Sequence, residues 1–259
     1  MTSADPARHE ISTERFAGQT IIVTGAGSGI GLATARRIAR EGGRVIATDL
    51  SRERLSALSH EKPGLDILCI PGDITTEECV ASVVEAAGDR IDGLANIAGV
   101  MDDFSPIHEV EDVMWERIFA INVTAIMRLS RAVLPLMLQA KSGSVVNISS
   151  EAGLRGSAGG AAYTAAKHAV IGLTRSSAVI YGLEGIRVNA VAPGSTITNL
   201  QAVWGSEMAA ARLKPLIAAN VPVSASAEEI AASVAFLLSR ESANMNGSVL
   251  VSDGGWGAI

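Results

Sequence analysis

Short apolar runs alternate with amphipathic segments along almost the whole chain. Such alternation is typical of a parallel sheet covered by helices on both faces, and the near-continuous apolar runs suit strands buried on both sides. The predicted fold class is therefore α/β, with a doubly wound, mostly parallel sheet. The predicted strands are 20–23, 44–48, 66–70, 91–97, 144–148, 186–191 and 248–251, and the predicted helices are 32–39, 52–59, 77–87, 112–127, 128–140, 161–181 and 228–239.

The composition argues against several other classes of protein. The chain has 259 residues, of which 48% are hydrophobic and 19% are charged, as in a globular protein rather than a disordered one. Its formal net charge of −6 argues against nucleic acid and anionic membranes as partners, because both require a basic surface. The two cysteines, Cys69 and Cys79, have no spacing typical of a disulfide framework or a metal site, so no metal is expected.

One domain is expected, preceded by a leader and interrupted by one long connection. Residues 1–18 are polar, carry charges of both signs and lack the apolar run of a signal peptide, so we expect a flexible leader. No run of about 18 apolar residues suggests a membrane span. Residues 19–259 are predicted to form a single domain of a cytoplasmic protein. Within it, residues 194–226 separate a strand from a helix, and a connection of this length is typical of a functional lid.

A glycine-rich turn follows the first predicted strand. Gly25, Gly29 and Gly31 fit a tight strand-to-helix turn, where the backbone can approach a pyrophosphate and the helix N-terminus offers free N–H groups. The turn departs from the strict G-x-G-x-x-G pattern, and no Gly-Lys-Ser/Thr follows, which excludes a P-loop. It indicates a Rossmann-type sheet with a dinucleotide site; a tight turn without a ligand is the alternative interpretation.

Asp49, at the end of the second predicted strand, bears on the choice of dinucleotide. An acidic side chain there accepts hydrogen bonds from the ribose hydroxyls and repels a 2′-phosphate, by roughly 4 kcal/mol for a charge pair about 4 Å apart. Arg36, Arg37 and Arg52 would relieve part of that repulsion, but Ser28 in the turn brings no positive charge. NAD is therefore predicted rather than NADP. The alternative is that Asp49 only caps the following helix.

Tyr163 and Lys167 are four residues apart at the start of the longest predicted helix, which places both side chains on one face. A neighbouring ammonium group stabilises the phenolate, so Lys167 is expected to lower the pKa of Tyr163 from about 10 by at most roughly 3 units. Such a phenol is suited to general acid–base catalysis near neutral pH. Because pairs of this kind also arise by chance on exposed helices, the interpretation needs support from other residues.

Seven motifs in order along the chain give that support. With them the chain resembles the short-chain dehydrogenase/reductase family in its common single-domain form, over nearly the whole chain from about Ala17. The resemblance implies that residues 19–259 form a single dinucleotide-binding and catalytic domain, with 194–226 as its substrate-binding lid. The motifs are TGAGSGIG (24–31), GDI (72–74), NIAG (96–99), Asn122, NISS (147–150), YTAAK (163–167) and PG (193–194).

The resemblance implies a role for each catalytic residue. Tyr163 is the acid/base that exchanges a proton with the substrate oxygen, and Lys167 lowers the pKa of that phenol and holds the nicotinamide ribose. Ser150, rather than the structural Ser149, hydrogen-bonds the reacting oxygen. Asn122 supports a water that relays protons through Lys167. The alternative interpretations are that Asn122 only pins a helix bend and that Ser150 only ends a strand.

The resemblance also implies the residues that bind NAD. The 72–74 motif contacts adenine, the 96–99 motif steadies the sheet beneath the ribose, and the segment from residue 193 binds the carboxamide and orients the nicotinamide for hydride transfer. Ile97 replaces the second asparagine usual in the family, a departure that concerns packing more than chemistry. The predicted cofactor-binding residues are Gly25, Ser28, Gly29, Ile30, Gly31, Asp49, Leu50, Asp73, Ile74, Asn96, Ala98, Gly99, Tyr163, Lys167, Pro193, Gly194, Thr196 and Thr198.

In this family the substrate pocket is formed by the loops after Gly99, Ser150 and Gly194. The loops of this chain carry mainly apolar side chains, which implies an uncharged, moderately hydrophobic substrate. Trp204 and Met208 have an alternative explanation as lid packing or subunit interface. The predicted lining is Met101, Phe104, Leu154, Trp204, Met208 and Leu213, with Glu151 and Arg155 as the nearest charges.

The function implied by the resemblance is hydride transfer between NAD(H) and a secondary alcohol or ketone. The alternative is an NADPH-dependent 3-oxoacyl-thioester reductase acting on an acyl carrier protein, which Asp49 and the net charge of −6 disfavour. A catalytically silent nucleotide-binding protein is a third hypothesis. By analogy with the family, a homotetramer is expected, formed through segments 114–140 and 161–181 and the last strand.

Overall fold

A computed structural model describes residues 14–60, 64–199 and 203–258 of the chain. Seven strands form one sheet in the order β3-β2-β1-β4-β5-β6-β7, and each pair of neighbours is parallel. This confirms the predicted doubly wound α/β class. The strands are β1 (Thr20–Thr24), β2 (Arg44–Asp49), β3 (Ile67–Pro71), β4 (Gly93–Asn96), β5 (Gly143–Ile148), β6 (Ile186–Pro193) and β7 (Val249–Ser252).

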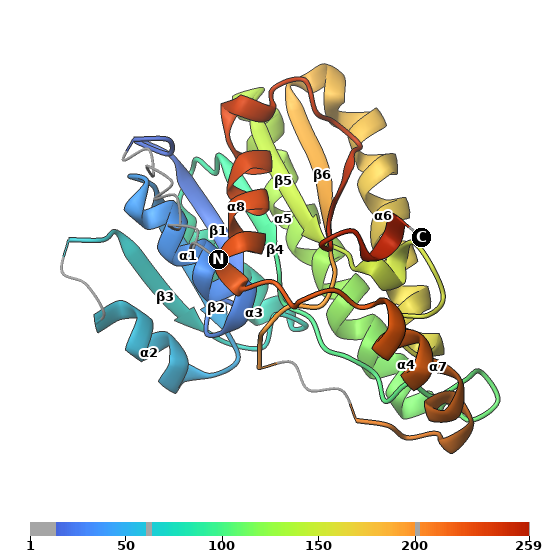
Figure 1. Cartoon of the computed structure of the whole chain (residues 1–259). Coiled ribbons are helices and arrows are strands. Elements are labelled where there is room, and N and C mark those ends of the chain that lie inside the picture. Colours follow the sequence, from blue (N-terminus) through green and yellow to red (C-terminus); the bar gives the residue numbers. More distant parts are fainter. Residues whose placement is uncertain (1–13, 61–63, 200–202, 259) are drawn as a thin grey trace, which may run out of the picture.

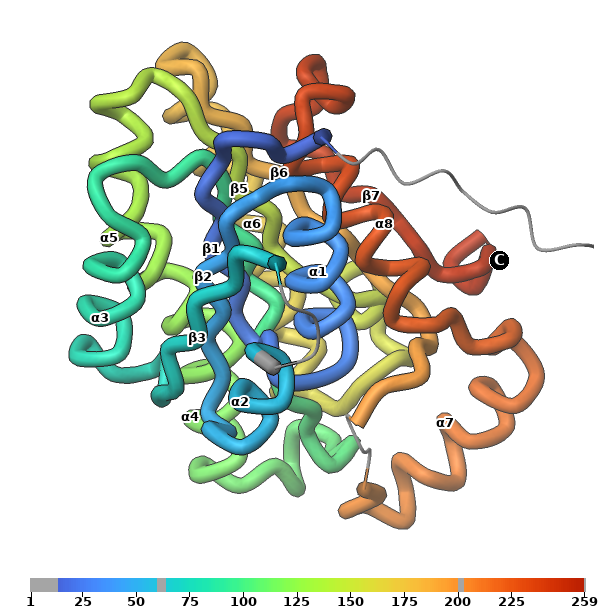
Figure 2. The backbone as a smooth tube through the Cα atoms, turned by 90° about the vertical axis from the view of Figure 1, so that its left-hand side faces the viewer, coloured from blue at the N-terminus to red at the C-terminus, as the bar shows by residue number. Residues whose placement is uncertain are grey.

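Helices cover both faces of the sheet (Figures 1 and 2). On one face α1 and α8 pack together, and Ile38 and Val234 from these two helices have no exposed surface. On the other face α3 and α5 contribute buried side chains such as Val83 and Leu129 to a second part of the core. The helices are α1 (Gly29–Arg40), α2 (Arg52–His60), α3 (Glu77–Ala87), α4 (Asp112–Phe119), α5 (Ala125–Ala140), α6 (Ala161–Tyr181), α7 (Glu207–Asn220) and α8 (Ala227–Leu238).

The predicted helices 112–127 and 128–140 form one continuous helical run. α4 continues through a π-helical turn, η1 (Ala120–Thr124), into α5. Turns of this kind are rare and occur frequently at functional sites. The run has the length and mean hydropathy, 1.4, of a helix able to cross a membrane. Leu129, Val133 and Met137 of this run are fully buried against the sheet and belong to the core.

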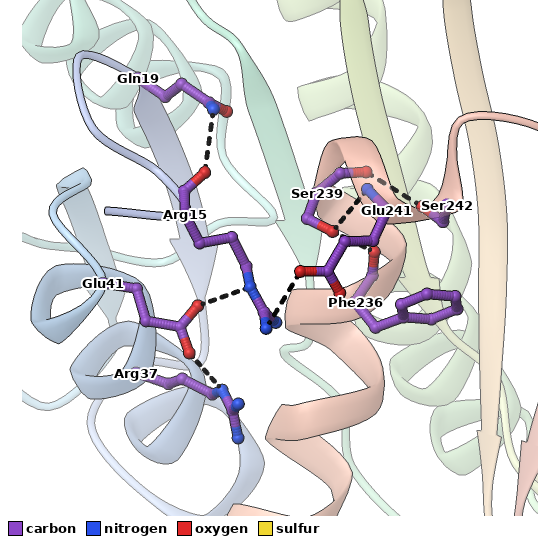
Figure 3. Close-up of polar contacts among 8 residues, drawn as sticks. All are labelled: Arg15, Gln19, Arg37, Glu41, Phe236, Ser239, Glu241 and Ser242. Atoms are coloured by element: carbon purple, nitrogen blue, oxygen red, sulfur yellow. Dashed lines mark hydrogen bonds and ion pairs between the residues drawn. The ribbon is translucent and has the colours of Figure 1, made fainter. Parts of the chain in front are cut away.

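The folded domain begins earlier than the predicted boundary after residue 18. Phe16 has no exposed surface and belongs to the same core as α1 and β1. Arg15 bridges two acids: its guanidinium lies 3.2 Å from Glu41 beyond the end of α1, and 3.3 Å from Glu241 in the short turn η4 (Arg240–Ser242) (Figure 3). The described part of the predicted flexible leader is therefore packed onto the domain, while residues 1–13 lie outside the described residues.

The connection predicted as a lid contains a helix that the sequence analysis missed, α7. Ser206 caps its first turn, since the Ser206 hydroxyl accepts a hydrogen bond from the Ala209 N–H at 3.1 Å. Ala209 is the one buried residue of this helix, so it lacks the apolar stripe by which sequence analysis finds helices. α7 extends away from the sheet (Figures 1 and 2). Residues 200–202 of the connection lie outside the described residues.

Candidate active site

The carboxyl ends of β1, β2 and β4 border a cavity of about 350 Å³. The chain leaves β1 towards β2 on one side and later returns to β4 on the other, and such a reversal of strand order is the usual ligand site of a doubly wound sheet. The predicted cofactor residues that line this cavity are Gly25, Ser28, Gly29, Ile30, Gly31, Asp49, Leu50, Asp73, Ile74, Ala98, Gly99 and Thr198.

The glycine-rich turn is a cradle that side chains would fill. A Cβ on Gly31 would collide with the Gly25 carbonyl oxygen, and a Cβ on Gly25 would lie 3.0 Å from the Ala98 Cα. Gly25 and Gly29 also have φ angles of +67° and +49°, which favour glycine. Ser28 precedes α1 without capping it by a side-chain hydrogen bond, so the first-turn N–H groups lack a side-chain acceptor. The cradle fits the phosphates of a dinucleotide.

Asp49 reaches this cavity from the end of β2 with its carboxylate held in place. Its Oδ2 accepts a hydrogen bond from the Gly27 N–H at 3.0 Å, and its Oδ1 accepts one from the Ser51 N–H at 2.8 Å. The Ser51 contact means that Asp49 also shapes the entry into α2, as the alternative interpretation holds. The Arg54 guanidinium lies 3.0 Å from Oδ1.

Arg54 is the arginine among the described residues that line this cavity. The sequence pattern instead pointed to Arg36, Arg37 and Arg52 as the arginines that would relieve the repulsion of a 2′-phosphate by Asp49. Arg37 forms an ion pair with Glu41 at 2.9 Å, on the side of α1 that faces the N-terminal segment (Figure 3). Arg54 lies in the first turn of α2, five residues after Asp49, and only the path of the chain between β2 and α2 brings their side chains together.

Asn96 is the predicted cofactor residue that lines neither of the two cavities described here. Its Nδ2 donates to Asn147 Oδ1 at 2.9 Å and to the Ser130 hydroxyl at 3.3 Å. Asn147 in turn donates to the Thr174 hydroxyl at 2.9 Å. This buried chain of hydrogen bonds links β4 and β5 to α5 and α6. Asn96 thus steadies the sheet, as the resemblance implies, but points away from the cofactor cavity because both of its donors serve the core.

A second cavity, of about 380 Å³, continues from the first, and Ile30, Ile97, Gly99 and Thr198 line both. It brings together three of the four predicted catalytic side chains, those of Ser150, Tyr163 and Lys167, but not that of Asn122. Ser150 follows β5, and the other two lie in the first two turns of α6. The remaining predicted cofactor residues also line this cavity, namely Pro193, Gly194 and Thr196.

Tyr163 is buried and lines the same cavity as Ser150. Burial raises the pKa of Tyr163 to about 12, the Ser150 hydroxyl opposes that rise, and the Asp102 carboxylate adds to it. The expected lowering by Lys167 is wrong for the protein by itself. The Lys167 Nζ lies 5.5 Å from the centre of the phenol ring, and burial lowers the pKa of Lys167 itself to about 8.

Lys167 and Asn122 both lie close to Gly99. The Lys167 Nζ donates to the Ile148 carbonyl at 2.9 Å, and a Cβ on Gly99 would lie 3.5 Å from that nitrogen and 2.8 Å from Asn122 Oδ1. Asn122 is fully buried in the π-helical turn η1. Its side chain accepts from the Val100 N–H and donates to the Val100 carbonyl, both at 2.9 Å. Asn122 therefore holds the loop after β4 and is not part of the described lining of either cavity.

Ser149 has the structural role that the resemblance implies. Its hydroxyl donates to the Lys167 carbonyl at 2.9 Å, and its N–H donates to the Val191 carbonyl at 2.8 Å. Gly153 packs closely against the same hydroxyl. These contacts join the end of β5 to α6 and β6, so they set the position of the neighbouring Ser150.

The lining of the second cavity agrees only in part with the prediction. Leu154 and Met208 are 41% and 51% exposed and, like Leu213, are not part of the lining. Trp256, from the short turn η5 (Trp256–Ala258) at the end of the chain, was missed because nothing in the local sequence brings that turn to the site. The apolar lining consists of Ile30, Ile97, Met101, Phe104, Ile148, Ala158, Trp204, Ile217, Val221 and Trp256.

The charges predicted beside this cavity face the C-terminal segment instead. Glu151 is buried and lies 2.7 Å from the Arg155 Nε, and the Arg155 guanidinium lies 4.7 Å from the centre of the Trp256 ring. Burial raises the pKa of Glu151, and a hydrogen bond with Asp253 raises it further. Arg155 therefore packs against the Trp256 ring, and neither Glu151 nor Arg155 is part of the described cavity lining.

Comparison with known proteins agrees with this geometry. Residues 19–209 match the family model described as short chain dehydrogenase. A short-chain dehydrogenase/reductase, cdmF, of Talaromyces verruculosus is 40% identical, over 92% of this chain and 97% of that protein. A 3beta-hydroxysteroid dehydrogenase of Eggerthella lenta is 37% identical, over 94% of this chain and 96% of that protein.

Solved structures also superpose on this chain over most of its length. The crystal structure of levodione reductase superposes with a TM-score of 0.86 at 36% identity, covering 95% of this chain and all of that one. A structure from Beutenbergia cavernae, with NADP bound at low occupancy, superposes with a TM-score of 0.81 at 35% identity, covering 94% of this chain and 98% of that one.

Proposed function

The chain belongs to the short-chain dehydrogenase/reductase family of oxidoreductases, and on this premise we propose that it transfers a hydride between NAD(H) and an uncharged, moderately hydrophobic secondary alcohol or ketone. One observation carries the proposal. The side chains of Ser150 and Tyr163 line the same cavity, which continues from the glycine cradle. A substrate oxygen that accepts hydrogen bonds from both would lie within reach of a cofactor in that cradle.

A bound nicotinamide cofactor would supply or accept the hydride. Gly25, Gly29 and Gly31 would hold its phosphates, and Asp49 would accept hydrogen bonds from its adenosine ribose. Asp49 favours NAD because its carboxylate is fixed in the cavity, where it repels a 2′-phosphate. Arg54 reduces this repulsion, so the preference for NAD rests on the carboxylate remaining close to the ribose.

The hydroxyl groups of Tyr163 and Ser150 have different roles at the substrate oxygen. When a ketone is reduced, Tyr163 gives its proton to the oxygen while Ser150 stabilises the charge that develops there. A phenol with a pKa of about 12 is protonated at neutral pH and is therefore ready for this step. When an alcohol is oxidised, the hydroxyl proton passes to the phenolate. The Lys167 ammonium, whose pKa of about 8 leaves it mainly charged at pH 7, would hold the nicotinamide ribose beside the phenol.

The lining of the second cavity supports an uncharged substrate. Lys167 is the one side chain with a formal charge among the described lining residues, and its ammonium is held by the Ile148 carbonyl. Phe104 and Trp204 stack with ring centres 4.2 Å apart, and Trp256 is part of the same lining. Such aromatic surfaces favour an apolar ring or chain next to the reacting oxygen. The hydroxysteroid and levodione in the names of the two relatives support a substrate of this kind.

A binding titration of NADH and NADPH, followed by tryptophan fluorescence, tests the cofactor. We expect tighter binding of NADH, and we expect Asp49→Asn to reduce the preference about tenfold or more, because removing one charge at about 4 Å removes a repulsion of a few kcal/mol. Asp66→Asn is the matched control, since this exposed acid changes the net charge equally and lies outside the described cavity lining.

The outcomes separate the candidate functions. A preference of the unmodified protein for NADPH would overturn the assignment of NAD and favour the 3-oxoacyl-thioester reductase. Binding of neither cofactor would contradict the proposed activity altogether. If NADH binds, reduction of a panel of cyclic and linear ketones then tests the substrate class, and activity confined to charged ketones would contradict an uncharged substrate.

A further inference from the structure

Asp102 lies in the loop between β4 and α4, and its carboxylate is buried, with 3% of the residue exposed. The carboxylate accepts three backbone hydrogen bonds. Oδ1 accepts from the Phe104 N–H at 3.1 Å and from the Gly160 N–H at 3.0 Å, and Oδ2 accepts from the Tyr163 N–H at 2.9 Å. One side chain of the substrate loop therefore binds directly to the backbone of the catalytic tyrosine.

The N-terminus of α6 needs such an acceptor. Gly160 occupies the capping position and has no side chain, and the first turn contains no acidic residue. The first N–H groups of a helix have no partner inside the helix, and a carboxylate placed there also interacts favourably with the helix dipole. Asp102 thus caps α6 from a position 61 residues before Tyr163.

The loop around Asp102 is pressed against the start of α6. A Cβ on Gly160 would lie 2.5 Å from Asp102 Oδ2 and 2.7 Å from the Phe104 Cα. Phe104 has a φ of +62°, a left-handed conformation that is unfavourable for a phenylalanine. The hydrogen bond from the Phe104 N–H to Asp102 helps to maintain this conformation, which places the Phe104 ring against Trp204 in the cavity wall.

We propose that Asp102 is a positioning residue: its carboxylate fixes the first turn of α6, and with it the phenol of Tyr163, relative to the loop that forms the substrate wall. The proposal rests on the proposed function, since it concerns the same phenol. The backbone N–H groups of Tyr163 and Phe104 both donate to the Asp102 carboxylate, so the distance between the acid/base and the wall of the cavity is fixed. Displacements of about 1 Å in a reacting geometry cost up to roughly a hundredfold in rate.

Asp102 also affects the proton on Tyr163. Among the described residues, the groups that face the phenol are the Asp102 carboxylate from the loop after β4, the Lys167 ammonium from α6 and the Ser150 hydroxyl from the end of β5. The negative charge of Asp102 raises the pKa of Tyr163, in addition to the larger effect of burial. Removing that charge without changing the shape of the side chain should therefore make the phenolate easier to form.

The test compares Asp102→Asn with Asp103→Asn. The first variant keeps the size of the side chain but loses the charge and an acceptor for the three N–H groups. The second removes an equal charge from the next residue, whose carboxylate accepts from the Ser105 N–H at 3.1 Å and contributes nothing to the pKa of Tyr163. Circular dichroism and cofactor binding show that each variant is folded.

A direct readout uses the fact that the chain contains two tyrosines, Tyr163 and Tyr181. In a Tyr181→Phe background, carbon-13 NMR of ring-labelled tyrosine reports the ionisation of Tyr163 whether or not the protein turns over a substrate. We expect phenolate formation to begin at a lower pH in Asp102→Asn, by roughly 0.5–1 unit, and at an unchanged pH in Asp103→Asn. An unchanged onset in Asp102→Asn would overturn the effect of the charge.

Steady-state kinetics test the positioning. In Asp102→Asn we expect kcat to fall by about tenfold to a hundredfold with a smaller change in the KM for the cofactor, and the acidic limb of alcohol oxidation to move to lower pH. Wild-type kcat and an unmoved limb would overturn the proposal. Inactivity of the unmodified protein towards every ketone would instead contradict the proposed function, and the NMR result would still stand.

Asp102→Glu decides the question if Asp102→Asn does not fold. The glutamate keeps the charge but carries the carboxylate about one carbon–carbon bond further from the backbone, so it cannot retain all three hydrogen bonds at their present lengths. We expect a lower kcat with the acidic limb at the wild-type pH. An undiminished kcat in Asp102→Glu would overturn the positioning role.

Discussion

At the scale of single residues, the reactivity of this site depends on how the hydroxyl groups are buried. The Ser150 hydroxyl accepts a hydrogen bond from the Ala152 N–H at 3.1 Å. The Lys167 ammonium donates one to the Ile148 carbonyl at 2.9 Å. Both groups are thus oriented before a substrate arrives, which lowers the cost of organising the reaction.

Replacing Tyr163 with phenylalanine removes the proton donor but keeps the ring that fills this part of the wall. We expect Tyr163→Phe to bind NADH as tightly as the wild type and to lose at least about a hundredfold in kcat, since a positioned acid/base contributes roughly 10²–10⁴. Fluorescence titration and ketone reduction measure the two effects. Tyr181→Phe, at the far end of the same helix, is the control. Equal kcat values in the two variants would contradict the role of Tyr163.

At the scale of elements, the substrate cavity is assembled from segments that are far apart in the chain. The loop after β4 supplies Phe104, α7 supplies Ile217, and η5 supplies Trp256. The Arg155 guanidinium lies over the Trp256 ring, and the Asp253 carboxylate accepts from the Gly257 N–H at 2.5 Å, so the first two residues of the C-terminal turn are held in place. The cavity therefore depends on the last residues of the fold as much as on the lid.

Truncating Trp256 should affect binding of the substrate more than the chemical step. We expect Trp256→Ala to raise the KM for an apolar ketone about tenfold or more, because a large aromatic contact is lost, while kcat changes less. Leu154→Ala is the matched control: the sequence places Leu154 in the lining, whereas in the structure it is 41% exposed and outside it. A larger KM effect in Leu154→Ala than in Trp256→Ala would contradict the observed lining.

At the scale of the whole molecule, a cluster of ion pairs joins the segment before β1 to the C-terminal ends of α1 and α8. Glu41 is fully buried between Arg15 and Arg37, and Arg15 continues to Glu241 beside α8 (Figure 3). Burial raises the pKa of Glu41, while the two arginines oppose the rise. Because the pKa of Glu41 is raised above 4.5 in the folded state, the contribution of this group to stability is most favourable below about pH 4.5 and is lost as the pH rises through the folded value.

Removing Arg15 should make this dependence steeper. We expect Arg15→Ala to lower the free energy of unfolding by roughly 1–3 kcal/mol at neutral pH, because a buried carboxylate keeps only one of its two partners. The loss should shrink towards pH 4, where Glu41 is protonated in both states. Urea unfolding at several pH values measures it. Arg90→Ala, which breaks an exposed pair with Asp92, is the control, and a loss that is equal at all pH values would contradict the explanation.

The sequence by itself determined the features that arise from neighbours along the chain. The alternation of strands and helices follows from short-range apolar patterns, and it predicted the class of the sheet correctly. The glycines of the turn and the four-residue spacing of Tyr163 and Lys167 also act locally, so their places in the site were predictable. Motif order added the family and, through it, the position of Ser150.

The tertiary structure alone decided what these residues experience. The pKa of Tyr163 depends on burial and on Asp102, 61 residues away, and no local pattern carries that information. Trp256 reaches the cavity and Phe16 reaches the core through packing between distant segments. The physical reason is that side-chain direction, burial and the strength of electrostatic interactions are set by the packed environment, whereas backbone conformation responds first to adjacent residues.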